Sequence, residues 1–146
     1  IDGLLRTNPK ASLFSRDGAI LATGNHTSLQ KRRKIAKTGT EIWTFPTFKG
    51  RIDLHTFVQR AAKAQIISMI VEGGSNLAAG FLHAQLVDTI HAYIAPRLLG
   101  RGIPAIGDLH INKISESLSL NQVQTHYLGP DILYEGEVKY PCSLES

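Results

Sequence analysis

Residues 66–80 read IISMIVEGGSNLAAG, and this stretch decides which fold the sequence predicts. The first six residues carry no charge and five of them are apolar, as a buried parallel strand requires. A Glu-Gly-Gly turn at 72–74 follows, and a helix is expected from Ser75 or Asn76. Glycines let the backbone approach a ligand closely, and a helix N-terminus offers N–H groups and a partial positive charge. The stretch therefore predicts a cradle for a phosphate or a dinucleotide, with the carboxylate of Glu72 beside it.

Strands and helices alternate on both sides of this stretch. Strands are expected at 19–23, 41–45, 66–71 and 88–95, and helices at 28–37, from Asp53 through Ala62, and at 76–85. Two further strands at 117–127 and 132–139 are joined by a Gly-Pro-Asp turn. The pattern predicts one α/β domain over 1–146, with a mostly parallel sheet and a C-terminal antiparallel hairpin.

Composition is ordinary for a globular domain. Hydrophobic residues make up 42% and charged residues 19%, and the formal net charge is +4. Part of that charge is the run Lys31–Lys34, which could contact nucleic acid but fits better as a solvated helix face, so we expect no nucleic-acid partner. No apolar run is long enough to span a bilayer, and the single cysteine, Cys142, excludes an internal disulfide. We therefore expect a cytoplasmic chain without a membrane partner.

The cradle has features beyond a glycine pair. Small residues at 78–80 keep the first helical turn thin, so a bulky ligand could lie along it. The spacing is not Gly-x-Gly-x-x-Gly, so the usual dinucleotide fingerprint is absent. Glu72 could be a solvated carboxylate, a cap for neighbouring N–H groups, or an acceptor for a substrate. Arg6, in a loop, could hold the 2′-phosphate of NADP or could be a surface residue.

The sequence contains no signature of a metal site, a zinc deaminase or a nucleophile-elbow hydrolase. The six histidines do not occur at metal-ligand spacing, so no metal site is expected. A zinc-deaminase signature and a Gly-x-Ser-x-Gly nucleophile elbow are both absent. No residue stands out as a general acid, base or nucleophile, so the prediction names no catalytic residue.

Three segments, taken in their order along the chain, carry a resemblance to a known family. They read IVEGGSNLAAGFL at 70–82, LVDTIHAYIAPRLLG at 86–100 and HYLGPDILYEG at 126–136. Together they resemble the reductase domain of the bifunctional riboflavin-biosynthesis deaminase/reductase. Ile1-Asp2-Gly3 with Leu5-Arg6-Thr7 also looks like the family's strand and turn at the nucleotide half of the cofactor, so the resemblance covers essentially the whole chain.

The resemblance implies a three-layer domain similar to dihydrofolate reductase, with helices on both faces of the sheet. It implies an NADPH-dependent reduction of 5-amino-6-(5-phosphoribosylamino)uracil to the ribityl product. Substrate contact carries over to Glu72. NADP contacts carry over to Gly3, Arg6, Gly74, Ser75, Asn76, Leu77, Ala78, Ala79 and Gly80. Holding the two reactants face to face demands little acid–base machinery of the protein.

Part of the family pattern is expected to precede Ile1. The first strand or strands of the reductase domain and the deaminase domain are not in the sequence. We therefore expect the C-terminal part of a reductase domain that does not turn over alone. The partners expected are the phosphorylated pyrimidine and a second copy in a homodimer. The alternatives are another dihydrofolate-reductase-like NADPH reductase, or a non-catalytic assembly or dimerisation fragment.

Overall fold

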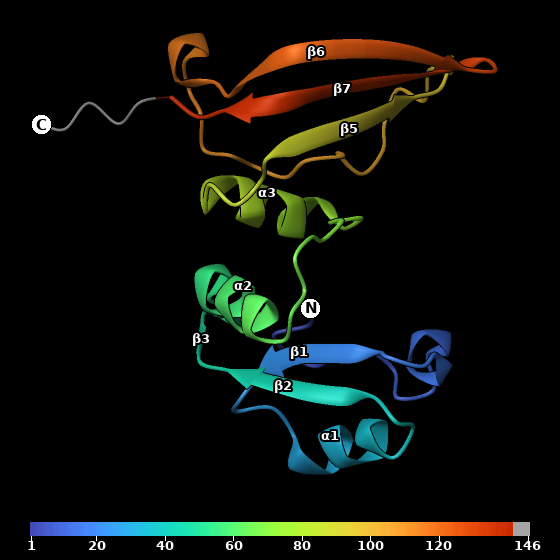
Figure 1. Cartoon of the computed structure of the whole chain (residues 1–146), viewed down its shortest axis with the longest axis vertical. Helices are drawn as coiled ribbons and strands as arrows, with labels where there is room; N and C mark the ends of the chain where they lie inside the picture. The colour runs from blue at the N-terminus through green and yellow to red at the C-terminus, as the bar shows by residue number, and fades with distance from the viewer. Residues whose placement is uncertain (142–146) are drawn as a thin grey trace, which may run out of the picture. The chain divides into compact units, whose positions relative to one another are not determined.

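The computed structural model describes residues 1–141, and Cys142 lies outside the described residues. The chain forms two compact units, residues 1–69 and residues 70–146. Each unit has its own strands and helices (Figure 1). The sequence predicted a single domain over 1–146, and this remains a prediction.

The first unit is built on a parallel pair of strands. β1 (Ile20–Gly24) pairs with β2 (Glu41–Phe45), and an isolated parallel bridge joins Asp2 to Thr23. α1 (Leu29–Ala36) connects the two strands, and the side chain of Ser28 caps it by accepting from the Lys31 N–H at 3.3 Å. The helix, its cap and both strands agree with the sequence prediction to within a residue or two.

Two hydrophobic clusters lie on opposite faces of this pair. One contains Trp43 and Phe45 of β2 with Ala61 of α2 (Leu54–Lys63), and the other contains Leu21 of β1 with Ile35 of α1. Alternation along the strands sends neighbouring side chains to different faces, so one helix packs on each side. In the first unit, α1 and α2 thus lie on opposite sides of β1–β2 (Figure 1).

A tight hairpin that the sequence analysis missed lies between β2 and α2. β3 (Thr47–Phe48) pairs with β4 (Arg51–Ile52), and Lys49 and Gly50 between them have φ of 49° and 75°. Positive φ at both central residues is the geometry of a hairpin turn with matching twist. An α2 cap follows directly, in which Asp53 accepts from the Thr56 N–H at 2.8 Å.

The second unit contains an antiparallel sheet in the order β5-β7-β6. Its strands are β5 (Thr89–Ile94), β6 (Ser119–Leu128) and β7 (Asp131–Lys139). The predicted C-terminal hairpin is confirmed, with Gly129 at φ 63° in its turn. α3 (Ser75–His83) precedes the sheet in the chain and buries Ala79, Phe81 and Leu82. Short 3-10 turns at Ser12–Ser15 and Ile114–Glu116 complete the regular structure of the described residues.

The predicted strand at 66–71 is wrong. Residues 66–74 form no helix or strand, and Ile67 and Ile70 are 98% and 89% exposed. A buried parallel strand needs hydrogen-bonded neighbours, and no described strand pairs with this run. The mostly parallel sheet is wrong for the same reason: β1–β2 is the only parallel strand pair in residues 1–141.

Described residues also include no helix that is both long and apolar enough to cross a membrane.

Candidate functional site

The start of α3 is an open helix N-terminus. Gly74 occupies the cap position with φ 67° and ψ 145°, and no side chain caps the helix. The carbonyl oxygen of Gly74 accepts from the N–H groups of Leu77 and Ala78 at 2.9 and 3.1 Å. Left-handed backbone at this position favours glycine, and an uncapped first turn leaves N–H groups for an anion.

Space around this turn is free. A Cβ built on Gly73 or on Gly74 would meet no heavy atom within 4 Å. Gly74 and Asn76 are exposed, while Ser75, Leu77, Ala78 and Gly80 are half-buried and Ala79 is buried. The two glycines are therefore not required by tight packing, which was the simplest structural reason for them. An anionic group of a ligand fits against the turn without displacing a side chain.

Glu72 stands just before the turn. Its carboxylate is exposed and has no hydrogen bond or ion pair to another residue of 1–141. It therefore does not cap the N–H groups of α3, one of the roles that the sequence left open. A free acceptor at this position can receive an N–H or O–H donor of a ligand.

A loop that the sequence analysis did not single out packs against the same turn. The Gly107 N–H donates to the carbonyl oxygen of Ser75 at 2.9 Å. A Cβ at Gly107 would lie 3.0 Å from that oxygen and 3.2 Å from Oδ1 of Asn76. At the other end of α3, the rings of His83 and His110 lie 5.5 Å apart. The only sequence signal for the contact between Gly107 and Ser75 was a Gly-Asp pair, Gly107-Asp108, in a Gly- and Pro-rich loop.

Gly3 and Arg6 belong to the first unit. A Cβ on Gly3 would lie 2.2 Å from the carbonyl oxygen of Gly50, so Gly3 has a packing role as well as its predicted cofactor role. Its carbonyl oxygen accepts from the Gly24 N–H at 3.1 Å. Arg6 is exposed, and its charge acts on the carboxylate of Asp2. Its guanidinium makes no side-chain hydrogen bond within residues 1–141, so its donors can receive an anionic ligand.

Asp2 holds the turn that carries Gly3 and Arg6. Its Oδ2 accepts from both the N–H and the hydroxyl of Thr7, each at 2.7 Å. Burial raises the pKa of Asp2, but the Thr7 hydrogen bonds and the Arg6 charge outweigh it and leave the pKa below its ordinary value. The turn therefore depends on an ionised Asp2.

Comparison with known proteins gives this geometry its family context. The sequence model of the family described as "RibD C-terminal domain" matches residues 1–134. The chain belongs to this family. The resemblance identified from the three sequence segments is thereby confirmed.

Two relatives illustrate the range of the RibD C-terminal domain family. The riboflavin biosynthesis protein RibD of Actinobacillus pleuropneumoniae is 32% identical over 115 residues, which are 77% of this chain and 31% of that protein. A 2,5-diamino-6-ribosylamino-4(3H)-pyrimidinone 5′-phosphate reductase of Methanothermobacter thermautotrophicus is 26% identical over 148 residues, covering 95% of this chain and 64% of that protein. The chain thus spans about a third of the RibD protein.

Solved structures support the α/β fold. RibD of Acinetobacter baumannii superposes with a TM-score of 0.74 at 20% identity, over 92% of this chain and 35% of that one. A pyrimidine reductase-like protein of Corynebacterium diphtheriae superposes with a TM-score of 0.72 at 20% identity, over 95% of this chain and 59% of that one. At such identities the likeness concerns the fold alone.

The predicted site residues of this RibD C-terminal domain chain fall into two groups. Glu72 and the first turns of α3 are contiguous in the second unit, and Gly3 and Arg6 share a turn of the first. Their predicted contacts with substrate and cofactor stay predictions. Within residues 1–141, no group of three or more His, Cys, Asp or Glu side chains is arranged to hold a metal ion.

The basic run at 31–34 is less solvated than the sequence indicated. The Lys31 ammonium donates to the carbonyl oxygen of Leu5, and Nη2 of Arg32 donates to that of Asn25 at 3.3 Å. Two of the four cations thus hold loops of the first unit in place. Arg33 and Lys34 remain exposed.

Proposed function

We propose that this chain is the C-terminal part of an NADPH-dependent reductase that acts on a phosphorylated pyrimidine in riboflavin biosynthesis. The proposal combines membership of the RibD C-terminal domain family with the uncapped α3 start beside the free carboxylate of Glu72. The name of the Methanothermobacter relative supplies the substrate class, a ribosylamino-pyrimidinone 5′-phosphate. The finer substrate, 5-amino-6-(5-phosphoribosylamino)uracil, follows from the resemblance.

The α3 start fits the phosphates of a dinucleotide. The free space at Gly73 and Gly74 and the uncapped first turn suit a pyrophosphate, and the small side chains of Ala78 and Ala79 leave the turn thin. Exposed Arg6 suits the 2′-phosphate that distinguishes NADPH from NADH. NADPH would supply the hydride. The chain's own part is to bind and orient the reactants, with Glu72 accepting a hydrogen bond from the substrate.

A charge placed at the α3 start tests the cofactor role. Ser75→Glu keeps the helix, because an acidic side chain in the first turn stabilises it, but repels a bound phosphate. We expect the dissociation constant for NADPH, measured by calorimetry, to rise about tenfold, which corresponds to ~1.4 kcal/mol of repulsion. Equal affinity in Ser75→Glu and the unaltered chain would contradict the cofactor role of α3.

Gln85→Glu is the matched control. It makes the same change of charge just after α3 and should leave NADPH affinity unchanged. Arg6→Gln should weaken NADPH more than NADH. Measuring turnover in the same samples tests the expectation that the chain binds cofactor without turning over.

The substrate role of Glu72 has a separate test. Glu72→Gln keeps the size of the side chain but removes its charge and one acceptor site. We expect it to weaken binding of the pyrimidine phosphate far more than binding of NADPH. Equal losses for both ligands would remove the substrate assignment.

An assembly role is the second candidate, with a homodimer as its simplest form. β5 and β6 are the outer strands of the β5-β7-β6 sheet, and Tyr93 and Tyr127 on them are exposed. Unpaired strand edges are templates for pairing with another chain. Sedimentation of the purified chain decides it: a monomer at all concentrations contradicts a dimerisation role.

A further inference from the structure

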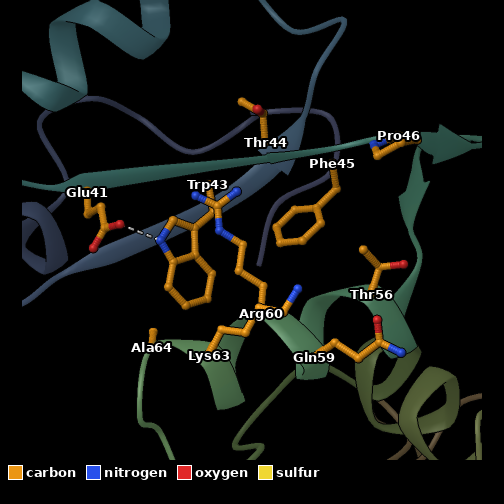
Figure 2. A pocket seen from close by; sticks show the side chains of 10 residues that line it. All are labelled: Glu41, Trp43, Thr44, Phe45, Pro46, Thr56, Gln59, Arg60, Lys63 and Ala64. Atoms are coloured by element: carbon orange, nitrogen blue, oxygen red, sulfur yellow. Dashed lines mark hydrogen bonds between the residues drawn. The ribbon is translucent and has the colours of Figure 1, made fainter.

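A cleft of about 530 Å³ lies between β2 and α2 in the first unit. None of the residues predicted to bind cofactor or substrate belongs to its lining. Figure 2 shows its lining side chains, which come from the two elements and the residue after each. The lining consists of Glu41, Trp43, Thr44, Phe45, Pro46, Thr56, Gln59, Arg60, Lys63 and Ala64.

Arg60 crosses the cleft over an aromatic floor. Its guanidinium carbon lies 4.9 Å from the ring centroid of Trp43 and 5.6 Å from that of Phe45 (Figure 2). Both rings are only 2% exposed. Cation–π attraction fixes the guanidinium in this position without occupying its N–H donors. A preorganised fork loses less entropy when it binds an acceptor.

Those donors have no acceptor in residues 1–141, where the side chain of Arg60 makes neither an ion pair nor a hydrogen bond. Glu41, the one carboxylate of the lining, makes no ion pair with Arg60, and its Oε1 accepts from Nε1 of Trp43 at 2.6 Å. The aliphatic stem of Arg60 covers the aromatic floor, which accounts for the position of the stem. This packing does not account for the guanidinium, whose five N–H donors are held in place without an anion.

A second cation stands one turn along the helix. Lys63 follows Arg60 by three residues on α2, so the two side chains lie on the same face. Lys63 likewise has no ion pair among the described residues. The hydroxyl group of Thr56 and the amide of Gln59 add donors to the lining.

We propose that this cleft binds the phosphate group of a small phosphate monoester, with Arg60 as the bidentate anchor. The two cations Arg60 and Lys63 outnumber the one carboxylate of the lining, Glu41, and a guanidinium fork matches phosphate oxygens geometrically. The site is independent of the reductase proposal, so either stands without the other.

Trp43 is the only tryptophan of the chain, so its indole N–H gives a single NMR signal from the floor of the cleft. Phenyl phosphate serves as the probe and benzyl alcohol as its uncharged match. We expect phenyl phosphate to shift the Trp43 signal saturably, with a dissociation constant of about 1 mM or below. No saturable shift, or the same titration curve with benzyl alcohol, overturns the proposal.

Two variants identify the anchor. Arg60→Gln should weaken phenyl phosphate about tenfold, the loss expected for charge-assisted hydrogen bonds. Arg33→Gln makes the same change of charge at an exposed position of α1 and should leave the affinity for phenyl phosphate unchanged. An equal loss in both variants, or none in Arg60→Gln, refutes the anchor. If Arg60→Gln does not fold, Arg60→Lys is decisive: it keeps the charge but lacks the fork, so unchanged affinity refutes a bidentate contact and about threefold weaker binding supports it.

Discussion

At the scale of single residues, Gly3 is placed where no side chain fits. The atom that a Cβ would meet at 2.2 Å is a backbone oxygen of Gly50, which cannot rotate away as a flexible side chain could. We expect Gly3→Ala to lower the free energy of unfolding by ~2 kcal/mol or more, measured by urea denaturation. Gly102→Ala is the control, since a Cβ there meets nothing within 4 Å. Equal stability of both variants would show that the turn adapts.

Asp2 makes the same turn sensitive to acid. Its pKa is lowered in the folded chain, so its stabilising contribution is present above its ordinary pKa of 3.8 and is lost as the pH falls through the lower folded value. Asp2→Asn should therefore destabilise the chain at pH 6 and make a smaller difference near pH 2.5. Urea unfolding across this range measures it. The control is Asp17→Asn, at an exposed carboxylate without a hydrogen bond, which should change the free energy of unfolding little. If Asp2→Asn lowers the free energy of unfolding by the same amount at pH 6 and near pH 2.5, the expectation is contradicted.

At the scale of elements, Tyr140 joins the segment after β7 to the segment before β5. Its hydroxyl accepts from the Val87 N–H and donates to the Val87 carbonyl oxygen, both at 3.1 Å. Burial raises the pKa of Tyr140, and the nearby Asp88 charge raises it further against the Val87 hydrogen bond. The hydroxyl's contribution is therefore full below its ordinary pKa of 10.0 and is lost as the pH rises through the folded value.

Tyr140→Phe should accordingly cost ~1–2 kcal/mol at neutral pH, because it leaves the two Val87 groups without this partner. Thermal unfolding followed by circular dichroism measures the loss. Tyr127→Phe, at an exposed hydroxyl, is the control and should change little. The assignment fails if the two variants are equally stable.

Elements with a local signal could be predicted from the sequence. Asp53 and Ser28 mark helix starts because a cap is a contact within three residues, and 41–45 alternates because β2 has two different faces. The run at 66–71 has an equally clear apolar signal, but a strand also needs neighbours, which sequence pattern does not supply. Two short strands at 47–52 were missed because their turn uses Lys49 in a left-handed conformation that glycine or asparagine usually takes.

The candidate site shows the same division. Glu72 and the α3 start could be located because they are contiguous in the chain. Contacts between distant segments, such as that of Gly107 with Ser75, depend on packing that no local pattern encodes. The β2–α2 cleft is another case, because Arg60 meets Trp43 only after the helix has packed on the sheet.

At the scale of the whole molecule, the chain consists of two compact units joined through residues without regular structure. A glutamate-specific protease should therefore cut first after Glu72, giving fragments 1–72 and 73–146. Glu135 and Glu137 should resist longer because they lie in the central strand β7. Mass spectrometry of early time points identifies the cuts. Glu72→Gln should abolish the early cleavage. Cutting after Glu72, Glu135 and Glu137 at the same rate would contradict the division into two units.

The exposed segment 66–71 also bears on how the chain behaves in concentrated solution. Its six residues, IISMIV, contain no charge and no proline and favour extended backbone, which is the composition of an aggregation-prone segment. The Ile66 N–H donates to the Ala61 carbonyl oxygen, but the backbone of the exposed residues 67–71 has no strand partner and can form a ladder with the same segment of another molecule. Glu72 directly follows and opposes such stacking, because identical charges would be brought into register. We therefore expect the carboxylate proposed to bind substrate to act also as a gatekeeper against fibril formation.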